Sequence, residues 1–246
     1  MQEPMSGLTQ KVQVTYLAHS GFAVEIGEKV LIFDYYEGDL SFISTKKQVY
    51  FFASHAHYDH FKRRIFQWAD KCEHVRYILS DDIQAKGPKG QTLKVQARQK
   101  LKLDDLKIQT LRSTDQGVAF LVETEGIRLY HAGDLNWWHW EEEGEVYNER
   151  MRRNYQHEIR KVLEGRRIDI AFLPLDPRQQ EQYSLGMDYY MRHTKTRYVF
   201  PMHMWEKYET CERFLKDPVS EDYRERVQRV TGPQQKFELK GETACR

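Results

Sequence analysis

The sequence predicts a layered fold of the α/β or α+β class, with strands in the first part of the chain and strands alternating with helices later. Two observations lead to this prediction. Short alternating or continuously apolar segments recur along the chain, and segments with helical spacing separate them mainly in the second half. The 246 residues, 40% of them hydrophobic, contain no repeat or linker-like tract, so we expect a single domain over residues 1–246.

The first third of the chain is expected to form mainly strands. Residues 11–17 alternate apolar and polar side chains, and residues 22–26 and 30–33 flank a short glycine-containing turn. Residues 49–53 form a continuous apolar run, which is typical of a strand buried on both faces. Residues 62–71 carry apolar side chains at helical spacing and are expected to form a helix.

The rest of the chain contains further strands interleaved with helices. The expected strands are residues 76–79, 107–111, 118–123, 127–131, 168–173, 197–200 and 236–239, the last at a sheet edge. The expected helices are residues 146–163, 186–193 and 206–215.

Composition argues against several classes of protein. The 38 basic and 37 acidic residues leave a net charge of +1, so no nucleic-acid partner is expected. No stretch reaches the roughly 18 to 20 apolar residues of a membrane span, and residues 1–10 lack a signal-peptide run. The widely spaced Cys72, Cys211 and Cys245 indicate free thiols. We expect a cytoplasmic protein, whose oligomeric state the sequence does not indicate.

Three of the ten histidines fall within one six-residue segment that directly follows the apolar run at 49–53. His55 and His57 are two residues apart at a strand end, so both can bind one cation. Asp59 and His60 follow after the chain turns, and could bind a second cation. The alternative is a solvated or hydrogen-bonded histidine loop.

Other metal-compatible side chains also follow apolar strands. Asp134 ends the segment Tyr-His-Ala-Gly-Asp, and His203 ends Phe-Pro-Met-His. Loops at strand ends commonly collect ligands in layered folds. Asp176 follows another apolar run, where it could support a ligand or cap a turn. Each of these is a common structural residue by itself, but together they predict one metal centre.

The segments Ser-His-Ala-His-Tyr-Asp-His, His-Ala-Gly-Asp and Pro-Met-His, in this order, resemble the metallo-β-lactamase superfamily. Residues 15–22 and 31–34 are similar to its branch of ascorbate-6-phosphate lactonase-like proteins and N-acyl-phosphatidylethanolamine phospholipase D. The resemblance covers about residues 12–203. It implies an α+β fold, a four-layer αββα sandwich of two mixed β-sheets with helices on the outer faces.

The resemblance also implies roles for individual residues. The first ion would be bound by His55 and His57, the second by Asp59, His60 and His203, with Asp134 bridging the two ions and Asp34 orienting the histidine loop. The implied cofactor is zinc, as one or two ions, with manganese, iron or nickel as alternatives.

One departure from the family concerns the first ion. A further histidine is expected near residues 110–114, where this chain has Arg112, and a guanidinium does not bind cations. The first site could therefore be incomplete. His131 is an alternative ligand, but the family usually has none at that position. We hypothesise that Arg112 binds an anionic group of a small-molecule substrate, against the alternative of a surface or ion-paired arginine.

Residues 135–140 follow Asp134 and contain three of the five tryptophans. They could form an aromatic wall beside the metals, with Trp137 as a substrate contact, or could simply anchor the next helix.

These features predict a metal-dependent hydrolase. A metal-bound hydroxide would attack a lactone, phosphoester or amide, while Asp59 and Asp134 orient the water. The alternatives are a metal-binding protein of the same fold with a degenerate first site and little catalysis, or a nuclease of the same superfamily.

Overall fold

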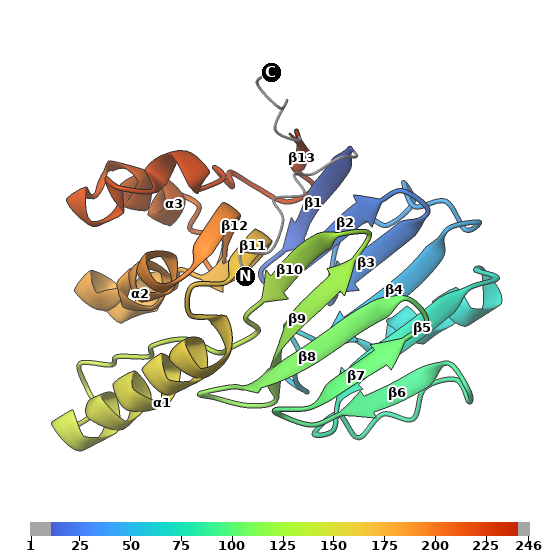
Figure 1. Cartoon of the computed structure of the whole chain (residues 1–246), viewed down its shortest axis with the longest axis horizontal. Coiled ribbons are helices and arrows are strands. Elements are labelled where there is room, and N and C mark those ends of the chain that lie inside the picture. Colours follow the sequence, from blue (N-terminus) through green and yellow to red (C-terminus); the bar gives the residue numbers. More distant parts are fainter. Residues whose placement is uncertain (1–10, 241–246) are drawn as a thin grey trace.

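The computed structural model describes residues 11–240 and has two β-sheets packed face to face (Figure 1). The first sheet has seven strands in the order β13-β1-β2-β3-β4-β5-β6. Their bounds are β1 Val12–Ala18, β2 Gly21–Ile26, β3 Lys29–Phe33, β4 Gln48–Ala53, β5 Val75–Ser80, β6 Thr92–Val95 and β13 Lys236–Leu239. Strands β3 to β6 run parallel and the other pairs are antiparallel, so this sheet is mixed.

The second sheet has six strands in the order β12-β11-β10-β9-β8-β7 and is also mixed. Its strands are β7 Lys100–Leu103, β8 Leu106–Arg112, β9 Val118–Thr124, β10 Ile127–His131, β11 Arg167–Pro174 and β12 Lys195–Met202. Strands β10, β11 and β12 are parallel, so their carboxyl ends lie at the same edge.

Helices cover the outer faces unequally. The α-helices found between residues 11 and 240 lie on the side of the second sheet (Figure 1). They are α1 Glu145–Leu163, α2 Leu185–His193 and α3 Glu209–Lys216. The first sheet is covered by a 3-10 helix, η1 Arg63–Asp70, where the sequence predicted a helix at 62–71. Shorter 3-10 turns are η2 Pro177–Gln182, η3 Pro218–Ser220 and η4 Arg224–Arg226. The predicted sandwich of two mixed sheets is confirmed.

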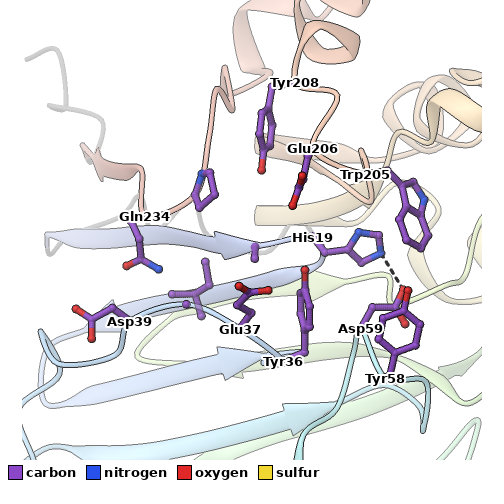
Figure 2. Close-up of a pocket in the computed structure, with 14 residues that line it drawn as sticks. His19, Tyr36, Glu37, Asp39, Tyr58, Asp59, Trp205, Glu206, Tyr208 and Gln234 are labelled. Atoms are coloured by element: carbon purple, nitrogen blue, oxygen red, sulfur yellow. Dashed lines mark ion pairs between the residues drawn. The ribbon is translucent and has the colours of Figure 1, made fainter.

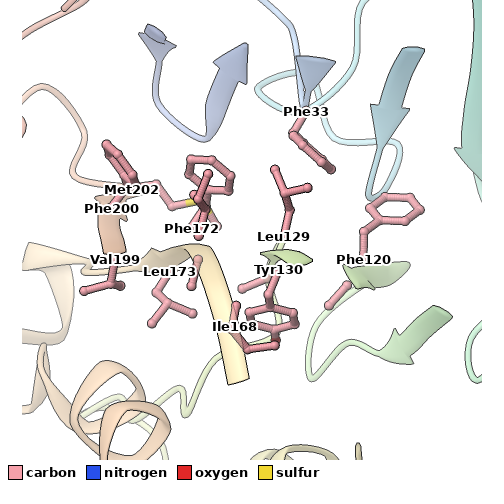
Figure 3. Packing of buried hydrophobic residues seen from close by; sticks show 14 of the residues in the cluster. Phe33, Phe120, Leu129, Tyr130, Ile168, Phe172, Leu173, Val199, Phe200 and Met202 are labelled. Atoms are coloured by element: carbon pink, nitrogen blue, oxygen red, sulfur yellow. The ribbon is translucent and has the colours of Figure 1, made fainter. Parts of the chain in front are cut away.

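Alternation along β3 and β4 explains why these strands read as continuous apolar runs. Leu31 and Phe33 point into the core between the two sheets, whereas Val30 and Ile32 point into a second apolar cluster on the outer face, under η1. Because both faces of β3 are covered, neither set of side chains needs to be polar. Figure 3 shows the aromatic and aliphatic side chains that fill the main core.

Other sequence predictions bear on cysteines and membranes. Cys72 and Cys211 are buried free thiols, while Cys245 and the predicted absence of a signal peptide at 1–10 lie outside the described residues. Between residues 11 and 240, none of the helices combines the length and apolarity needed to cross a bilayer.

The buried ring of Phe52 tests the contact between the sheets. It stacks on Phe33 at 4.8 Å between centroids and meets Phe120 of the second sheet at 5.3 Å. We expect Phe52→Ala to lower the free energy of unfolding by about 3–5 kcal/mol, because it leaves a cavity between the sheets. Urea denaturation measures this loss. Val146→Ala, at a position 87% exposed, is the control and should change stability by less than about 0.5 kcal/mol.

Candidate metal centre

Residues that follow the ends of six strands meet at one edge of the sandwich. They are His19 after β1, Asp34 after β3, residues 54–60 after β4, Asp134 after β10, Asp176 after β11 and His203 after β12. The backbone turns sharply at three of these points, since His19, Asp34 and His203 have positive φ angles of 50°, 44° and 64°. These turns direct side chains of both sheets toward one another.

Two glycines let the loops of the second sheet approach the histidine loop closely. Gly117 and Gly133 have φ angles of +66° and +51°. A Cβ atom at Gly117 would lie 2.0 Å from the carbonyl oxygen of Ser54, and one at Gly133 would lie 2.6 Å from the Ser54 Cβ. Larger residues at either position would therefore push Asp134 away from His55.

The Asp134 carboxylate lies at the centre of the cluster. Its Oδ1 is 3.3 Å from His60 Nε2 and 3.4 Å from His203 Nε2, and its Oδ2 is 3.4 Å from His55 Nε2. His55 Nε2 lies 2.9 Å from His57 Nδ1. The structure thus brings together histidines and a carboxylate from three separate parts of the chain, as the sequence analysis predicted.

The distances from the Asp134 oxygens to the three imidazoles fit a shared cation better than they fit hydrogen bonds. Two ligand atoms at about 2.0–2.1 Å from a tetrahedral zinc ion lie about 3.3–3.4 Å apart. Within residues 11–240, buried His19 Nε2, His60 Nε2 and Asp134 Oδ1 have no hydrogen-bond partner. Buried polar atoms without partners are costly, and a shared cation would satisfy all three.

Asp34 fixes the orientation of the histidine loop. This fully buried carboxylate accepts hydrogen bonds from the Ser54 backbone N–H at 2.7 Å, the Ser54 hydroxyl at 2.6 Å and His60 Nδ1 at 2.7 Å. With Nδ1 donating to Asp34, the Nε2 lone pair of His60 faces the cluster. The predicted position of Asp34 beneath the loop agrees with this geometry.

Asp176 orients the His203 ring in the way that Asp34 orients His60. It accepts a hydrogen bond from His203 Nδ1 at 2.9 Å and from Trp205 Nε1 at 3.2 Å. Arg178 binds both oxygens of the same carboxylate, at 3.0 and 2.6 Å. The sequence left two roles open for Asp176, and the structure is compatible with both. Asp176 orients His203, and it caps a helix by accepting the Arg178 backbone N–H.

Two further residues join the cluster that sequence reasoning did not assign. His19 forms a potential cation-binding group with Asp59, His60 and His203, and its Nε2 lies 3.3 Å from Asp59 Oδ2. Asp115 forms another such group with His57 and Asp134. Asp115 lies just beyond residues 110–114, where a third histidine was expected, so a search for any ligand-type residue in that turn would have found it.

Arg112 lies outside this cluster. It ends β8 with an exposed side chain, and its backbone N–H donates to Glu158 of α1 at 3.2 Å. Among the described residues, its guanidinium has no hydrogen-bond or ion-pair partner. Its role in binding an anionic substrate stays a prediction.

The tryptophan-rich segment divides between packing and the cluster. Trp137 packs edge-on against Tyr189 of α2, with 6.0 Å between ring centroids. Trp138 lies next to the site, 5.5 Å from the His203 ring, and its Nε1 donates to the Asp134 carbonyl at 3.0 Å. The aromatic wall of the centre is thus formed by Trp138, while Trp137 as a substrate contact stays a prediction.

His131 is occupied by other contacts. Its Nε2 lies 2.9 Å from the Ser20 carbonyl, its Nδ1 accepts the Gly133 N–H at 3.1 Å, and its ring stacks on Phe33. No lone pair remains to bind a cation.

The electrostatics of the site favour positive charge. Burial lowers the pKa of His19 and of His55 to about 4, so both imidazoles are neutral at pH 7. Burial also acts to lower the pKa of His60. The Asp134, Asp34 and Asp59 carboxylates outweigh burial and raise this pKa to about 9. The pKa of Asp34 falls to about 2 despite burial, because His131 and His60 stabilise its charge. Without a bound cation, the His60 proton therefore supplies the positive charge that these carboxylates attract.

Comparison with known proteins identifies the family. Residues 13–146 match the family model described as the beta-lactamase superfamily domain, a little over half of the chain. The chain belongs to this superfamily and has the metallo-β-lactamase fold. The branch suggested by residues 15–22 stays a prediction. A search of curated proteins gives no match.

Solved structures of the same fold include metal-dependent enzymes. Igni18, a metallo hydrolase from the archaeon Ignicoccus hospitalis, is 19% identical with a TM-score of 0.63, and the match covers 94% of this chain and 99% of Igni18. YhfI from Bacillus subtilis is 13% identical with a TM-score of 0.64, over 94% and 100%. CmlA, a diiron β-hydroxylase from Streptomyces venezuelae, is 10% identical with a TM-score of 0.62, over 96% and 55%. These likenesses establish the fold.

Removing the charge of Asp34 tests its orienting role. We expect Asp34→Asn to weaken metal binding about 10- to 100-fold, because the His60 ring loses the carboxylate that fixes its tautomer. Competition with a chromophoric chelator measures the affinity. Asp169→Asn is the control, since Asp169 is similarly buried but bonds Arg128 and Arg167. Equal losses in both variants would contradict the assignment.

Asp115 is tested by metal stoichiometry. We expect Asp115→Asn to reduce the bound metal from two ions per chain toward one, because the group with His57 and Asp134 loses a carboxylate. Elemental analysis after dialysis gives the count. Arg112→Ala should leave the count unchanged, and an Asp115→Asn protein that keeps two ions would rule out Asp115 as a ligand.

Proposed function

We propose that the protein is a metal-dependent hydrolase that cleaves an ester-like bond, such as a lactone, phosphoester or amide. The observation that carries this proposal is the convergence of buried, unpartnered imidazole and carboxylate atoms at ligand spacing around Asp134. Bound cations would acidify water and polarise the substrate oxygen.

Three overlapping groups of potential ligands lie side by side: His19, Asp59, His60 and His203; His55, His60 and Asp134; and His57, Asp115 and Asp134. We propose that they hold two ions, the first bound by His55, His57 and Asp115 and the second by His19, Asp59, His60 and His203, with Asp134 shared between the two ions. Neutral imidazoles with carboxylates suit zinc, and manganese, iron or nickel are the alternatives. We propose zinc as the resident ion.

Asp59 is well placed to orient a water molecule. It lies at the wall of a cavity of about 380 Å³ that opens beside the cluster, so substrate can reach it. Burial opposes the ionisation of Asp59, but the neighbouring imidazoles of His19 and His60 stabilise its charge and hold its pKa well below its usual range. An ionised Asp59 can bind the cation and orient a water molecule beside it.

The alternatives are a degenerate metal-binding protein and a nuclease. The degenerate metal-binding protein was considered because Arg112 stands where a third ligand of the first ion is expected. The Asp115 carboxylate would supply that ligand instead. A nuclease requires a basic surface, whereas acidic residues line the cavity beside the site. Both observations favour the hydrolase.

Loss of a ligand tests the proposal. We expect the purified protein to contain tightly held metal and to hydrolyse at least one compound in a screen of lactones, phosphoesters and amides. His57→Ala should lower that activity by at least about a hundredfold, since a water-activating ion is displaced. His74→Ala, at an exposed histidine outside the cluster, is the control. Full activity of His57→Ala, or full activity after chelation, would overturn the proposal.

A further inference from the structure

The cavity beside the metal centre lies between two loops from different sheets. Residues 36–39 follow β3 and residues 205–208 follow β12, and His19 and Asp59 form the end nearest the metal cluster (Figure 2). With a volume of about 380 Å³, the cavity can hold a small organic group. A substrate bound at the metal centre would therefore extend into this space.

The charge in this cavity has one sign. Glu37, Asp39 and Glu206 line it, and none of them belongs to a potential cation-binding group in the described chain. In Figure 2, Glu37 and Glu206 extend into the cavity from opposite loops. Lys236 partly offsets the charge of Asp39. Within residues 11–240, Glu37 and Glu206 form no ion pair, so metal binding would leave these two negative charges in the cavity.

Within residues 11–240, neither lysine nor arginine lines the cavity. The nearest arginines are bound elsewhere, since Arg178 pairs with Asp176 behind Trp205 and Arg64 donates to the Tyr36 carbonyl at 2.7 Å. Away from the metal centre, the described lining therefore offers an anionic group no lysine or arginine as a partner.

Aromatic rings complete the lining. Tyr36, Tyr58, Trp205 and Tyr208 line the same space, and Tyr58 is unusual in being 65% exposed. The faces of such rings attract organic cations, and rings combined with carboxylates form the usual recognition site for ammonium groups.

The inner end of the cavity is formed by His19, whose side chain is only 4% exposed and whose Nε2 lies 3.3 Å from Asp59 Oδ2. Because both residues also belong to one potential cation-binding group, the cavity leads directly to the metal cluster.

We infer that this cavity binds the ammonium group of a cationic substrate, between the Glu37 and Glu206 carboxylates and the aromatic rings, while the scissile bond lies at the metal centre. The inference rests on the proposed hydrolase function, whose substrate class it specifies. The hypothesis that Arg112 binds an anionic substrate predicts the opposite charge preference. One binding assay therefore decides between the two hypotheses.

The test compares two ligands of the same shape. Choline and 3,3-dimethylbutan-1-ol differ in the charge of one atom, and each can be titrated into the metal-loaded full chain by NMR. We expect choline to bind about tenfold more tightly than the alcohol. In the Glu37→Gln/Glu206→Gln variant, choline should bind about as weakly as the alcohol, and binding of the alcohol should not change.

The matched control is Glu73→Gln/Glu164→Gln, which removes the same charge at exposed positions outside the cavity. It should retain the tenfold preference. Equal binding of choline and the alcohol, or a preference that survives Glu37→Gln/Glu206→Gln, would overturn the inference. Metal content and the hydrolase screen are read separately, so a protein that hydrolyses esters without preferring choline loses this inference and keeps the proposed function.

Discussion

The arrangement of the candidate centre depends on the buried carboxylate of Asp34. Its bonds to Ser54 and His60 hold the loop after β4 against the end of β3. The same side chain of Ser54 meets Gly133, so the loop that carries Asp134 is positioned against the same point. A single ionised group thus sets the relation between histidines on the first sheet and the central carboxylate of the second.

Geometry and charge lead to the same interpretation of the site. The carboxylates of Asp34 and Asp176 each direct one imidazole Nε2 toward Asp134, leaving lone pairs to face an ionised oxygen. Such a cluster is stable only with a proton or a cation among its members. Beyond it, the acidic and aromatic cavity extends the negative potential to the surface, where it can select the substrate by charge.

Sequence alone predicted the parts of the fold whose signal is local. The run at 49–53 and the neighbouring His55 and His57 are read directly, because burial and strand alternation leave periodic patterns. Strands β6 and β7 were missed because their lysine-containing segments are half-exposed edges, stabilised by their neighbours. His19 and Asp115 were missed because their contacts to residues far along the chain arise only when the two sheets close.

The central position of Asp134 also links the ion to the lifetime of the protein. His55 follows a strand of the first sheet and Asp134 a strand of the second, so an ion held between them would cross-link the two halves of the sandwich. Unfolding would then require release of the ion, and the folded population would follow its free concentration. Under metal starvation, the unloaded chains would open more often and be degraded first, so the supply of the ion would set the abundance of the protein.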